Sequence, residues 1–382
     1  MNVEHVSSRA GLGSTSARAV YGLFGLPFDA VDRKTVLARI RSAIETRTRL
    51  FITTPNTNNL IASAADVPFR NSFIRSDIAV ADGMPIVWIA RLAGIPIHER
   101  VAGASLFEEM QRGAAGPMRV YIFGGPDGAA EAAHDRINAQ GGPMTCVGWC
   151  SPGFVSIPEM SSPWHIDAIN HSDPDVVIAA LSSQKGQAWV ERNRASLSAP
   201  VIMHLGAVVN FTAGTLKRAP EVVQRAGFEW LWRIKEEPML WRRYYKDGRA
   251  LFALLRAHLG PLVRNERTMR RAGGDASAVV DPRQDVTRMI LRGSWTGAAI
   301  TADRSLLALR DCGGDIELDL SQAVAFDSAA IGWLMSLYGQ QSNAGAGFRV
   351  TAVGPRARRS FESQRAAYLI DESLTRTTLG SA

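Results

Sequence analysis

The sequence predicts an α/β fold with more than one domain. Short, continuous apolar runs alternate with helical patterns between about residues 20 and 213, and such runs are typical of strands buried in a parallel sheet. A second, smaller alternation of strands and helices follows residue 285. The chain of 382 residues is long enough for two or three domains. Its 46% hydrophobic and 21% charged residues argue against a disordered or fibrous protein.

Each element of this prediction follows from a local pattern. Six segments of the first region have the composition of buried strands, and they cover residues 50–54, 78–81, 120–123, 146–149, 176–181 and 201–205. In the second region the patterns predict strands at 286–291, 316–320 and 348–353, with helices at 329–341 and 356–365.

The positive charge of the chain is concentrated in one segment. The net charge is +7, but residues 214–271 alone hold 14 Lys and Arg against 6 Asp and Glu. The same segment contains seven aromatic residues: Phe228, Trp230, Trp232, Trp241, Tyr244, Tyr245 and Phe252. This mixture is typical of surfaces that bind nucleic acid, an anionic membrane or a phosphorylated ligand. Residues 241–259 also have helical apolar spacing, which predicts an amphipathic helix with a cationic face. Its arginines and aromatics favour contact with a membrane, and a helix packed on its own domain is the alternative.

These shifts in composition divide the chain into five parts. We expect a mobile leader over 1–20, a first domain over 21–213, a basic amphipathic appendage over 214–262, a polar linker over 263–284 and a second domain over 285–376. The three cysteines, Cys146, Cys150 and Cys312, are too few for a disulfide framework, so we expect thiols in a reducing compartment. No apolar run has the length of a membrane span, and we expect a soluble, intracellular protein.

Polar residues and glycines follow several predicted strands, where open α/β sheets bind ligands. Thr54 and Asn56 follow the first strand, although Thr and Asn are also common helix caps. Asp82 follows the second strand and is a candidate general base, or else a turn residue before glycine. Gly124 and Gly125 end the third strand in a turn that can hold an anionic group. The Asp173-Pro174-Asp175 triplet is better interpreted as a loop than as a metal site, and we expect no metal.

Taken in chain order, these stretches resemble the WecG/TagA/CpsF family of bacterial glycosyltransferases. The matching stretches are T-P-N at 54–56, A-D-G-M-P-I-V-W at 81–88, E-R-V-A-G at 99–103, F-G-G at 123–125, D-P-D at 173–175, K-R-A-P at 217–220 and G-F-E-W-L-W-R at 227–233. The resemblance covers roughly residues 22–259. It implies a Rossmann-like domain with a mostly parallel sheet. It also implies inverting transfer of a sugar from a UDP-sugar to a polyprenyl-diphosphate-linked acceptor, without a cofactor or a metal.

The resemblance also implies roles for individual residues. Asp82 matches the general base, Thr54 and Asn56 would position a substrate, and Arg100 would contact the reacting groups. Arg233 and Arg243 resemble arginines that hold the leaving diphosphate, where a fixed guanidinium stabilises developing negative charge. The other predicted nucleotide- or diphosphate-binding residues are Gly124, Gly125, Phe154, Asn210 and Arg242.

Three positions depart from the family's pattern. Gly186 stands where the family has an active-site glutamine, and Gln184 and Gln187 are the nearest alternatives. Asn210 replaces an aspartate proposed to contact the nucleoside, so it can form hydrogen bonds but has no charge. Phe154 replaces a tyrosine. These changes leave the identity of the donor sugar open.

Residues 286–371 resemble a STAS domain, the fold of anti-sigma-factor antagonists. The resemblance depends on L-D-L-S at 318–321, F-D-S-A-A-I-G at 326–332 and F-R-V at 348–350. In regulatory members a second serine is phosphorylated, and Ala329 stands at that position here. The resemblance therefore implies a module for protein–protein contact or self-association, unless Ser328 takes over the phosphorylation.

Together these features predict a glycosyltransferase of exopolysaccharide or cell-surface polysaccharide synthesis. We expect it to be cytoplasmic and peripheral on the inner face of the membrane, with its cationic segment on an anionic lipid surface. One alternative is a non-catalytic scaffold that senses a nucleotide-sugar and acts through the STAS-like domain. The other alternative, a nucleic-acid binder, is motivated by the arginines and aromatics and is not the function that we predict.

Overall fold

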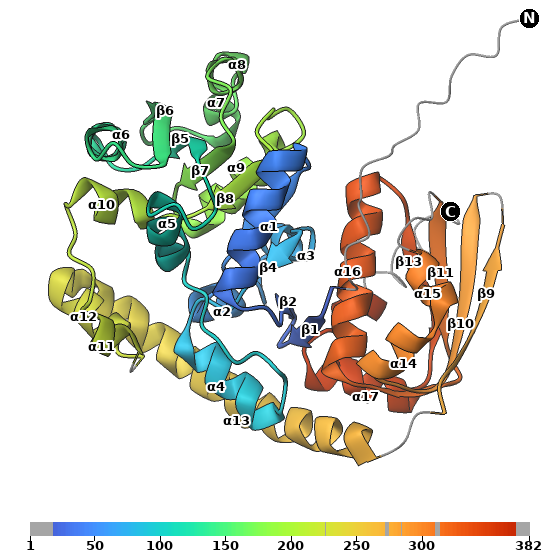
Figure 1. Cartoon of the computed structure of the whole chain (residues 1–382). Helices are drawn as coiled ribbons and strands as arrows, with labels where there is room; N and C mark the ends of the chain where they lie inside the picture. Colours follow the sequence, from blue (N-terminus) through green and yellow to red (C-terminus); the bar gives the residue numbers. More distant parts are fainter. Residues whose placement is uncertain (1–17, 226, 272–274, 284, 310–313, 372–382) are drawn as a thin grey trace, which may run out of the picture.

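The first domain contains a six-stranded parallel sheet, shown in the computed structural model in Figure 1. The structure describes residues 18–371 except 226, 272–274, 284 and 310–313. The sheet has the order β4-β3-β8-β7-β5-β6. Its strands are β3 (Leu50–Thr53), β4 (Ile78–Ala79), β5 (Met118–Gly124), β6 (Met144–Cys150), β7 (Val176–Ala180) and β8 (Val201–His204). All six predicted strands of this domain are therefore confirmed.

Helices cover both faces of this sheet because its strands are apolar on both sides. One face packs against α1 (Arg33–Thr46), α5 (Gly103–Gln111), α6 (Ala129–Ala139) and α10 (Val208–Ala213). The other face packs against α7 (Ile157–Met160), α8 (Pro163–His171) and α9 (Ser183–Asn193), with Trp189 stacked on Phe123. The sheet edge at β4 meets a third cluster. It joins α2 (Thr57–Ala62), α3 (Val67–Ile74), α4 (Met84–Ala93) and the hairpin of β1 (Val20–Leu23) and β2 (Leu26–Asp29).

The basic segment is helical and runs beneath the first domain in Figure 1. It comprises α11 (Glu221–Arg225), α12 (Glu229–Glu236), a short 3-10 helix (Pro238–Leu240) and α13 (Trp241–Arg271). The 31 residues of α13 make a helix about 46 Å long. Leu254 and Leu262 are buried against the α4 cluster, whereas Trp241, Tyr245 and Phe252 are exposed. The helix therefore packs on its own domain, as the alternative interpretation expected, and it also leaves aromatic and basic side chains exposed.

The predicted linker over 263–284 is wrong for most of its length. α13 continues to Arg271, and β9 (Ser277–Pro282) follows it. Leu262, Glu266 and Met269 are spaced by four and three residues and are all buried, so one face of the helix stays packed in a sequence that is otherwise polar. The predicted leader lies largely outside the described residues, and its last residue, Val20, begins β1.

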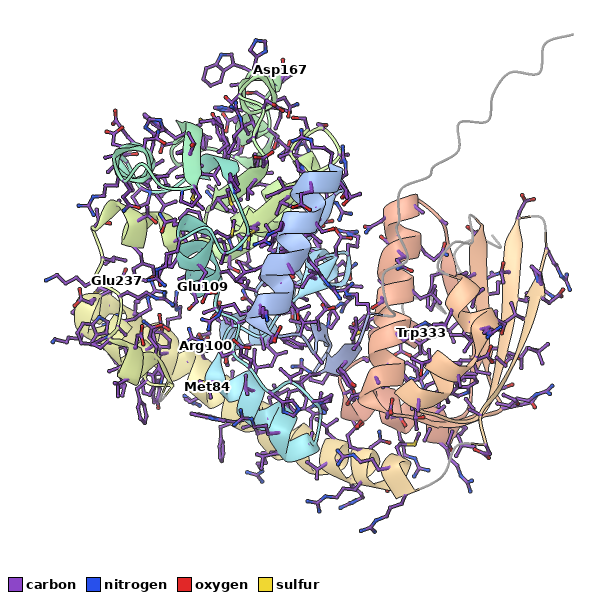
Figure 2. The ribbon with its side chains drawn as sticks, in the orientation of Figure 1. Met84, Arg100, Glu109, Asp167, Glu237 and Trp333 are labelled. Atoms are coloured by element: carbon purple, nitrogen blue, oxygen red, sulfur yellow. The ribbon has the colours of Figure 1, made fainter. Side chains whose placement is uncertain are left out.

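The C-terminal unit is a second α/β layer structure. Its sheet has the order β12-β10-β11-β13, with β9 antiparallel to β10. The strands are β10 (Val286–Trp295), β11 (Asp315–Leu320), β12 (Ala323–Phe326) and β13 (Phe348–Val353). The helices are α14 (Gly297–Ala302), α15 (Arg304–Ala308), α16 (Ser328–Ala344) and α17 (Pro355–Ser363). Trp333 on α16 is buried in the core that these elements share (Figure 2).

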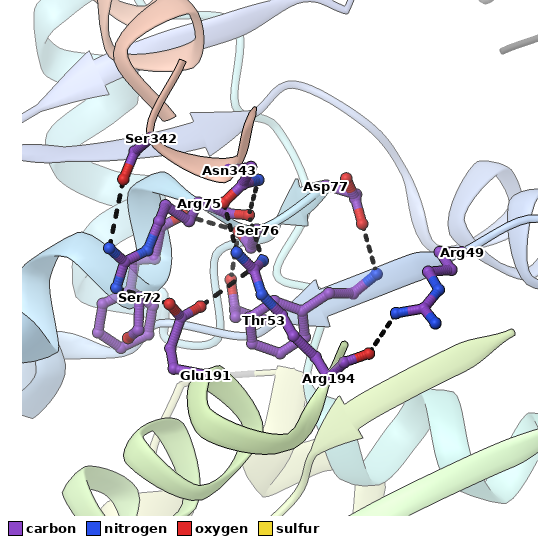
Figure 3. Close-up of polar contacts among 12 residues, drawn as sticks. Arg49, Thr53, Ser72, Arg75, Ser76, Asp77, Glu191, Arg194, Ser342 and Asn343 are labelled. Atoms are coloured by element: carbon purple, nitrogen blue, oxygen red, sulfur yellow. Dashed lines mark hydrogen bonds and ion pairs between the residues drawn. The ribbon is translucent and has the colours of Figure 1, made fainter. Parts of the chain in front are cut away.

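Helix α16 also packs directly against the first domain. A side chain at Gly332 would lie 2.3 Å from the carbonyl of Val20, and one at Gly339 would lie 2.3 Å from the carbonyl of Ile74. At the end of this helix, Arg75 donates to Ser342 at 3.3 Å and Asn343 donates to the Arg75 carbonyl at 3.1 Å (Figure 3). Only glycines allow the helix to approach so closely, so the two units are held together by backbone contact and a polar network.

Candidate active site

A large cleft lies at the carboxyl ends of the parallel strands. Its volume is about 1540 Å3, and its walls come from the segments that follow β3, β4, β5, β7 and β8. Helices α12 and α13 supply the facing wall, with Glu229, Arg233, Arg243 and Tyr244 among its residues. The cleft therefore lies between the sheet and the basic segment, at the sheet edge where open α/β folds bind their ligands.

Asp82 and Arg100 meet in this cleft. Arg100 Nη2 lies 3.3 Å from Asp82 Oδ1, and the backbone N–H of Gly103 donates to Asp82 Oδ2 at 3.4 Å. Burial raises the pKa of Asp82 and the charge of Arg100 lowers it, while the nearby Glu229 raises it again. A partly enclosed carboxylate with a raised pKa, reachable from a cleft, is suited to accept a proton.

Arg100 has a second partner on the basic segment. The same Nη2 atom lies 2.5 Å from Glu229 Oε2 on α12, so the guanidinium bridges two carboxylates. Figure 2 places Arg100 on the side of the first domain that faces the helices of the basic segment. Glu229 was not among the predicted site residues, although it lies inside the 227–233 stretch that resembles the family.

Thr54 and Asn56 both line the cleft. The Asn56 side chain accepts from the N–H of Asn59 at 3.1 Å, and Asn59 Oδ1 accepts from the N–H of Asn56 at 2.9 Å. This reciprocal pair caps α2. The helix-cap interpretation of Asn56 is therefore correct, and the residue also faces the cleft.

The turn after β5 and helix α10 form another part of the wall. Gly124 and Gly125 have φ angles of 100° and 99°, which strongly favour glycine. Gly125, Asn210 and the highly exposed Phe154 line the cleft. Gly124 does not line it, because the space beside its Cα is occupied by Leu181.

The three predicted arginines of the basic segment have different positions. Arg233 and Arg243 line the cleft, and Arg233 also pairs with Glu237 at 3.1 Å. Arg242 is exposed outside the cleft, with its guanidinium 5.7 Å from the ring of Trp241. Adjacent side chains on a helix point about 100° apart, so Arg242 and Arg243 cannot both face the cleft.

The Asp173-Pro174-Asp175 triplet lies away from the cleft residues. Asp173 and Asp175 pair with Arg47 at 3.3 and 3.2 Å, and Asp175 also accepts from the N–H of Arg119. The loop interpretation is therefore supported by ion pairs that use both carboxylates. Within the described part of the chain, no group of three or more His, Cys, Asp or Glu could hold a metal ion.

Three further cleft residues were not among the predicted site residues, although Gln187 was named as an alternative to the missing family glutamine. Asp247 on α13 accepts from Asn58 Nδ2 at 3.1 and 3.0 Å, which connects the basic segment to α2. Gln187 is buried on α9 and His204 ends β8, and both line the cleft. The places of Asp247 and His204 in the cleft become visible only when distant segments are brought together.

The fold and the cleft define an α/β protein with a large cleft at the carboxyl edge of a parallel sheet, beneath a basic helical wall. Residues 21–263 match the Glycosyl transferase WecG/TagA/CpsF family, and the chain belongs to that family of glycosyltransferases. The matched region ends inside α13, so the C-terminal unit lies beyond it.

Curated relatives agree with this membership. The chain is 25% identical over 207 residues to an N-acetylglucosaminyldiphosphoundecaprenol N-acetyl-beta-D-mannosaminyltransferase of Bacillus spizizenii, covering 54% of this chain and 79% of the relative. An enzyme of the same name from Bacillus subtilis is 24% identical over 194 residues, covering 50% and 73%. One from Staphylococcus aureus is 21% identical over 231 residues, covering 60% and 88%.

Proposed function

We propose that this protein transfers a sugar from a UDP-sugar to a polyprenyl-diphosphate-linked acceptor, with inversion. The observation that carries the proposal is the Asp82 carboxylate, held by Arg100 in a cleft that a basic helical wall closes. The similar proteins are named for transfer to a diphosphoundecaprenol-linked sugar, which supports the acceptor class.

The cleft residues suggest how the reaction proceeds. Asp82 accepts the proton of the acceptor hydroxyl, whose oxygen then attacks the anomeric carbon of the donor. The bond from that carbon to the diphosphate breaks, and UDP leaves with the bonding electrons. Arg233 and Arg243 face the cleft, where they stabilise the charge on the diphosphate. Arg100 and the Gly103 N–H lower the pKa of Asp82 and so oppose part of the effect of burial.

The outer surface of the basic segment supports contact with an anionic membrane. Trp241, Tyr245 and Phe252 are 52%, 61% and 69% exposed and lie at the cleft mouth. Exposed cations lie among them on α13: Arg242, Lys246, Arg249 and Arg256. Such a surface inserts aromatics into the headgroup region while each basic residue adds about 1 kcal/mol. No helix in the described ranges has the length and apolarity to cross a bilayer.

We therefore place the protein peripherally on the cytoplasmic face of the membrane, in exopolysaccharide or cell-surface polysaccharide synthesis. The C-terminal unit fits a STAS-like module for a protein partner or self-association. Ser328 is fully buried there and donates to Glu266 Oε1 at 2.8 Å, so phosphorylation at this serine requires the contact to open.

To test the proposed reaction, the protein is given a panel of UDP-sugars as donors and a polyprenyl-diphosphate-sugar as acceptor, and the release of UDP is measured. Wild type should release UDP with one donor, and Asp82→Asn should lose most of that rate because the amide cannot accept the proton. Equal rates in the two proteins would overturn the assignment of Asp82. UDP binding without any turnover would instead favour the non-catalytic scaffold.

A second experiment tests whether the exposed surface of the basic segment binds a membrane. Binding to anionic vesicles is compared with binding to RNA and DNA at matched ionic strength, because nucleic-acid binding weakens steeply with salt. Preference for nucleic acid over vesicles would contradict the membrane contact.

A further inference from the structure

Gly186 and His204 occupy one space between α9 and β8. A Cβ atom at position 186 would lie 2.1 Å from Cδ2 and 2.5 Å from Nε2 of His204. No side chain fits at 186 while the imidazole is there. Successive side chains of β8 point to opposite faces of the sheet. Met203 faces the α1 side, so His204, like Ile202, faces the α9 side. The absent side chain at 186 is what gives the imidazole its place at the cleft wall.

The hydrogen bond of His204 defines what the ring can offer a ligand. Nε2 lies 3.0 Å from the carbonyl oxygen of Leu181, and a carbonyl only accepts, so Nε2 carries the proton. Burial lowers the pKa of His204, so the ring is neutral near pH 7. Nδ1 is then a hydrogen-bond acceptor, and no partner for it exists among the residues that the structure describes.

Gln187 adds a second unpaired polar group beside this ring. Its side chain is 1% exposed and lines the same cleft, yet its Oε1 has no hydrogen-bond partner within the described residues. A buried amide oxygen without a partner costs about 1–3 kcal/mol, and such groups are rare unless a ligand completes them.

The position of these groups points to the sugar. Leu205, which follows His204, packs against Gly103, since a side chain there would lie 2.4 Å from Leu205 Cδ2. Gly103 in turn donates its N–H to Asp82. His204, Gln187 and the proposed base Asp82 all line this one cleft, in which the proposed function places the transferred sugar.

We propose that His204 Nδ1 and the Gln187 side-chain amide bind the hydroxyl or amide groups of the donor sugar, with Gly186 providing the room. This proposal rests on the proposed function, because it assigns the sugar-binding part of that site. His204 and Gln187 are then specificity-determining residues, because a sugar without donors for them leaves His204 Nδ1 and the buried Gln187 Oε1 unpaired.

Two substitutions of His204 separate ligand binding from support of the fold. His204→Asn keeps an acceptor near the position of Nδ1 but loses the bond to Leu181. His204→Gln can reach Leu181 with its amide N–H but has no acceptor at that position. Calorimetry on the full chain compares UDP with UDP-N-acetylmannosamine as probes, so the measurement does not depend on turnover.

We expect His204→Gln to weaken binding of UDP-N-acetylmannosamine about five- to tenfold and to leave UDP unchanged. His204→Asn should bind both within about twofold of wild type, although its melting temperature falls. His171→Ala, on the exposed end of α8, serves as the control. The reverse pattern, or equal weakening of UDP and the sugar nucleotide, would overturn the proposal.

Two more variants test the shared space and the unpaired amide. Gly186→Ala should weaken sugar-nucleotide binding when it is made in the wild-type protein. The same change made in the His204→Ala variant should have little further effect, because the new methyl group clashes only with the imidazole ring. Gln187→Leu should weaken binding of the sugar nucleotide while the melting temperature stays the same or rises. A fall in melting temperature without a change in binding would contradict a ligand role for Gln187. If the binding results are as expected but no UDP is released, the proposed transfer reaction is wrong and the proposed sugar-binding site is still supported.

Discussion

Arg100 and Glu229 are 129 positions apart in the sequence, yet their Nη2 and Oε2 atoms lie 2.5 Å apart at the wall of the cleft. Arg100 also contacts Asp82, and Glu229 is the first residue of α12. The contact therefore links the proposed base to the basic helical wall. Because Glu229 also raises the pKa of Asp82, the position of α12 affects the chemistry of the carboxylate as well as the shape of the cleft.

The first prediction concerns the acid side of the pH–rate profile. Glu229→Gln removes a negative charge that raises the pKa of Asp82, so Asp82 should remain ionised to lower pH. The acidic limb of kcat/KM should move to lower pH, measured as UDP release between pH 4 and 8. Glu236→Gln changes the charge of the same helix and forms the control. An acidic limb that stays in place or moves upward would contradict the coupling.

The second prediction concerns the link between α13 and α2. Asp247→Ala removes both hydrogen bonds from Asn58, which at a partly exposed site should cost about 1–2 kcal/mol locally. Asn58→Asp should cost at least as much, because two carboxylates then face each other. Hydrogen exchange over residues 241–250 should become faster in both variants. Unchanged exchange would mean that Asp247 does not hold the helix to the cleft.

The third prediction separates two adjacent arginines. Arg243→Ala should lower UDP release about tenfold or more even with a water-soluble acceptor, because Arg243 faces the cleft. Arg242→Ala should leave that rate nearly unchanged and weaken binding to anionic vesicles, because Arg242 points outward beside Trp241. Equal effects of the two changes in both assays would contradict the different positions of the side chains.

The fourth prediction is a pH dependence of stability. Burial raises the pKa of Glu266 to about 7, well above its usual value. The folded protein therefore holds a proton there that the unfolded chain releases above about pH 4.5, so this contribution to stability falls as pH rises toward 7. Glu266→Gln should be more stable than wild type by a margin that grows between pH 5 and 8, reaching on the order of 3 kcal/mol.

Melting temperatures at several pH values measure this margin. In the Glu266→Gln variant the side-chain amide oxygen can still accept from Ser328, as Glu266 Oε1 does at 2.8 Å. Glu362→Gln, on the exposed side of α17, provides the control. A margin that is constant with pH would show that Glu266 does not titrate in this range.

In both sheets, the sequence predicted the strands that have a clear local pattern. Short apolar runs bounded by turn residues were sufficient for all six strands of the parallel sheet. β1, β2, β9 and β12 were missed. β9 alternates exposed and partly buried residues, and β2 contains Pro27, so neither has the composition of a buried strand.

The sequence by itself determined the parallel sheet, the family and the residues that follow the strand ends, because strand composition and turn chemistry are local properties. Nine of the eleven predicted site residues line the cleft, and only Gly124 and Arg242 do not. The tertiary structure decided which side chains meet: Arg100 with Glu229, Asn58 with Asp247, and His204 with the space at Gly186. The first two contacts join segments far apart in the chain and the third joins a helix to the next strand, and close packing, rather than any local preference, selects them.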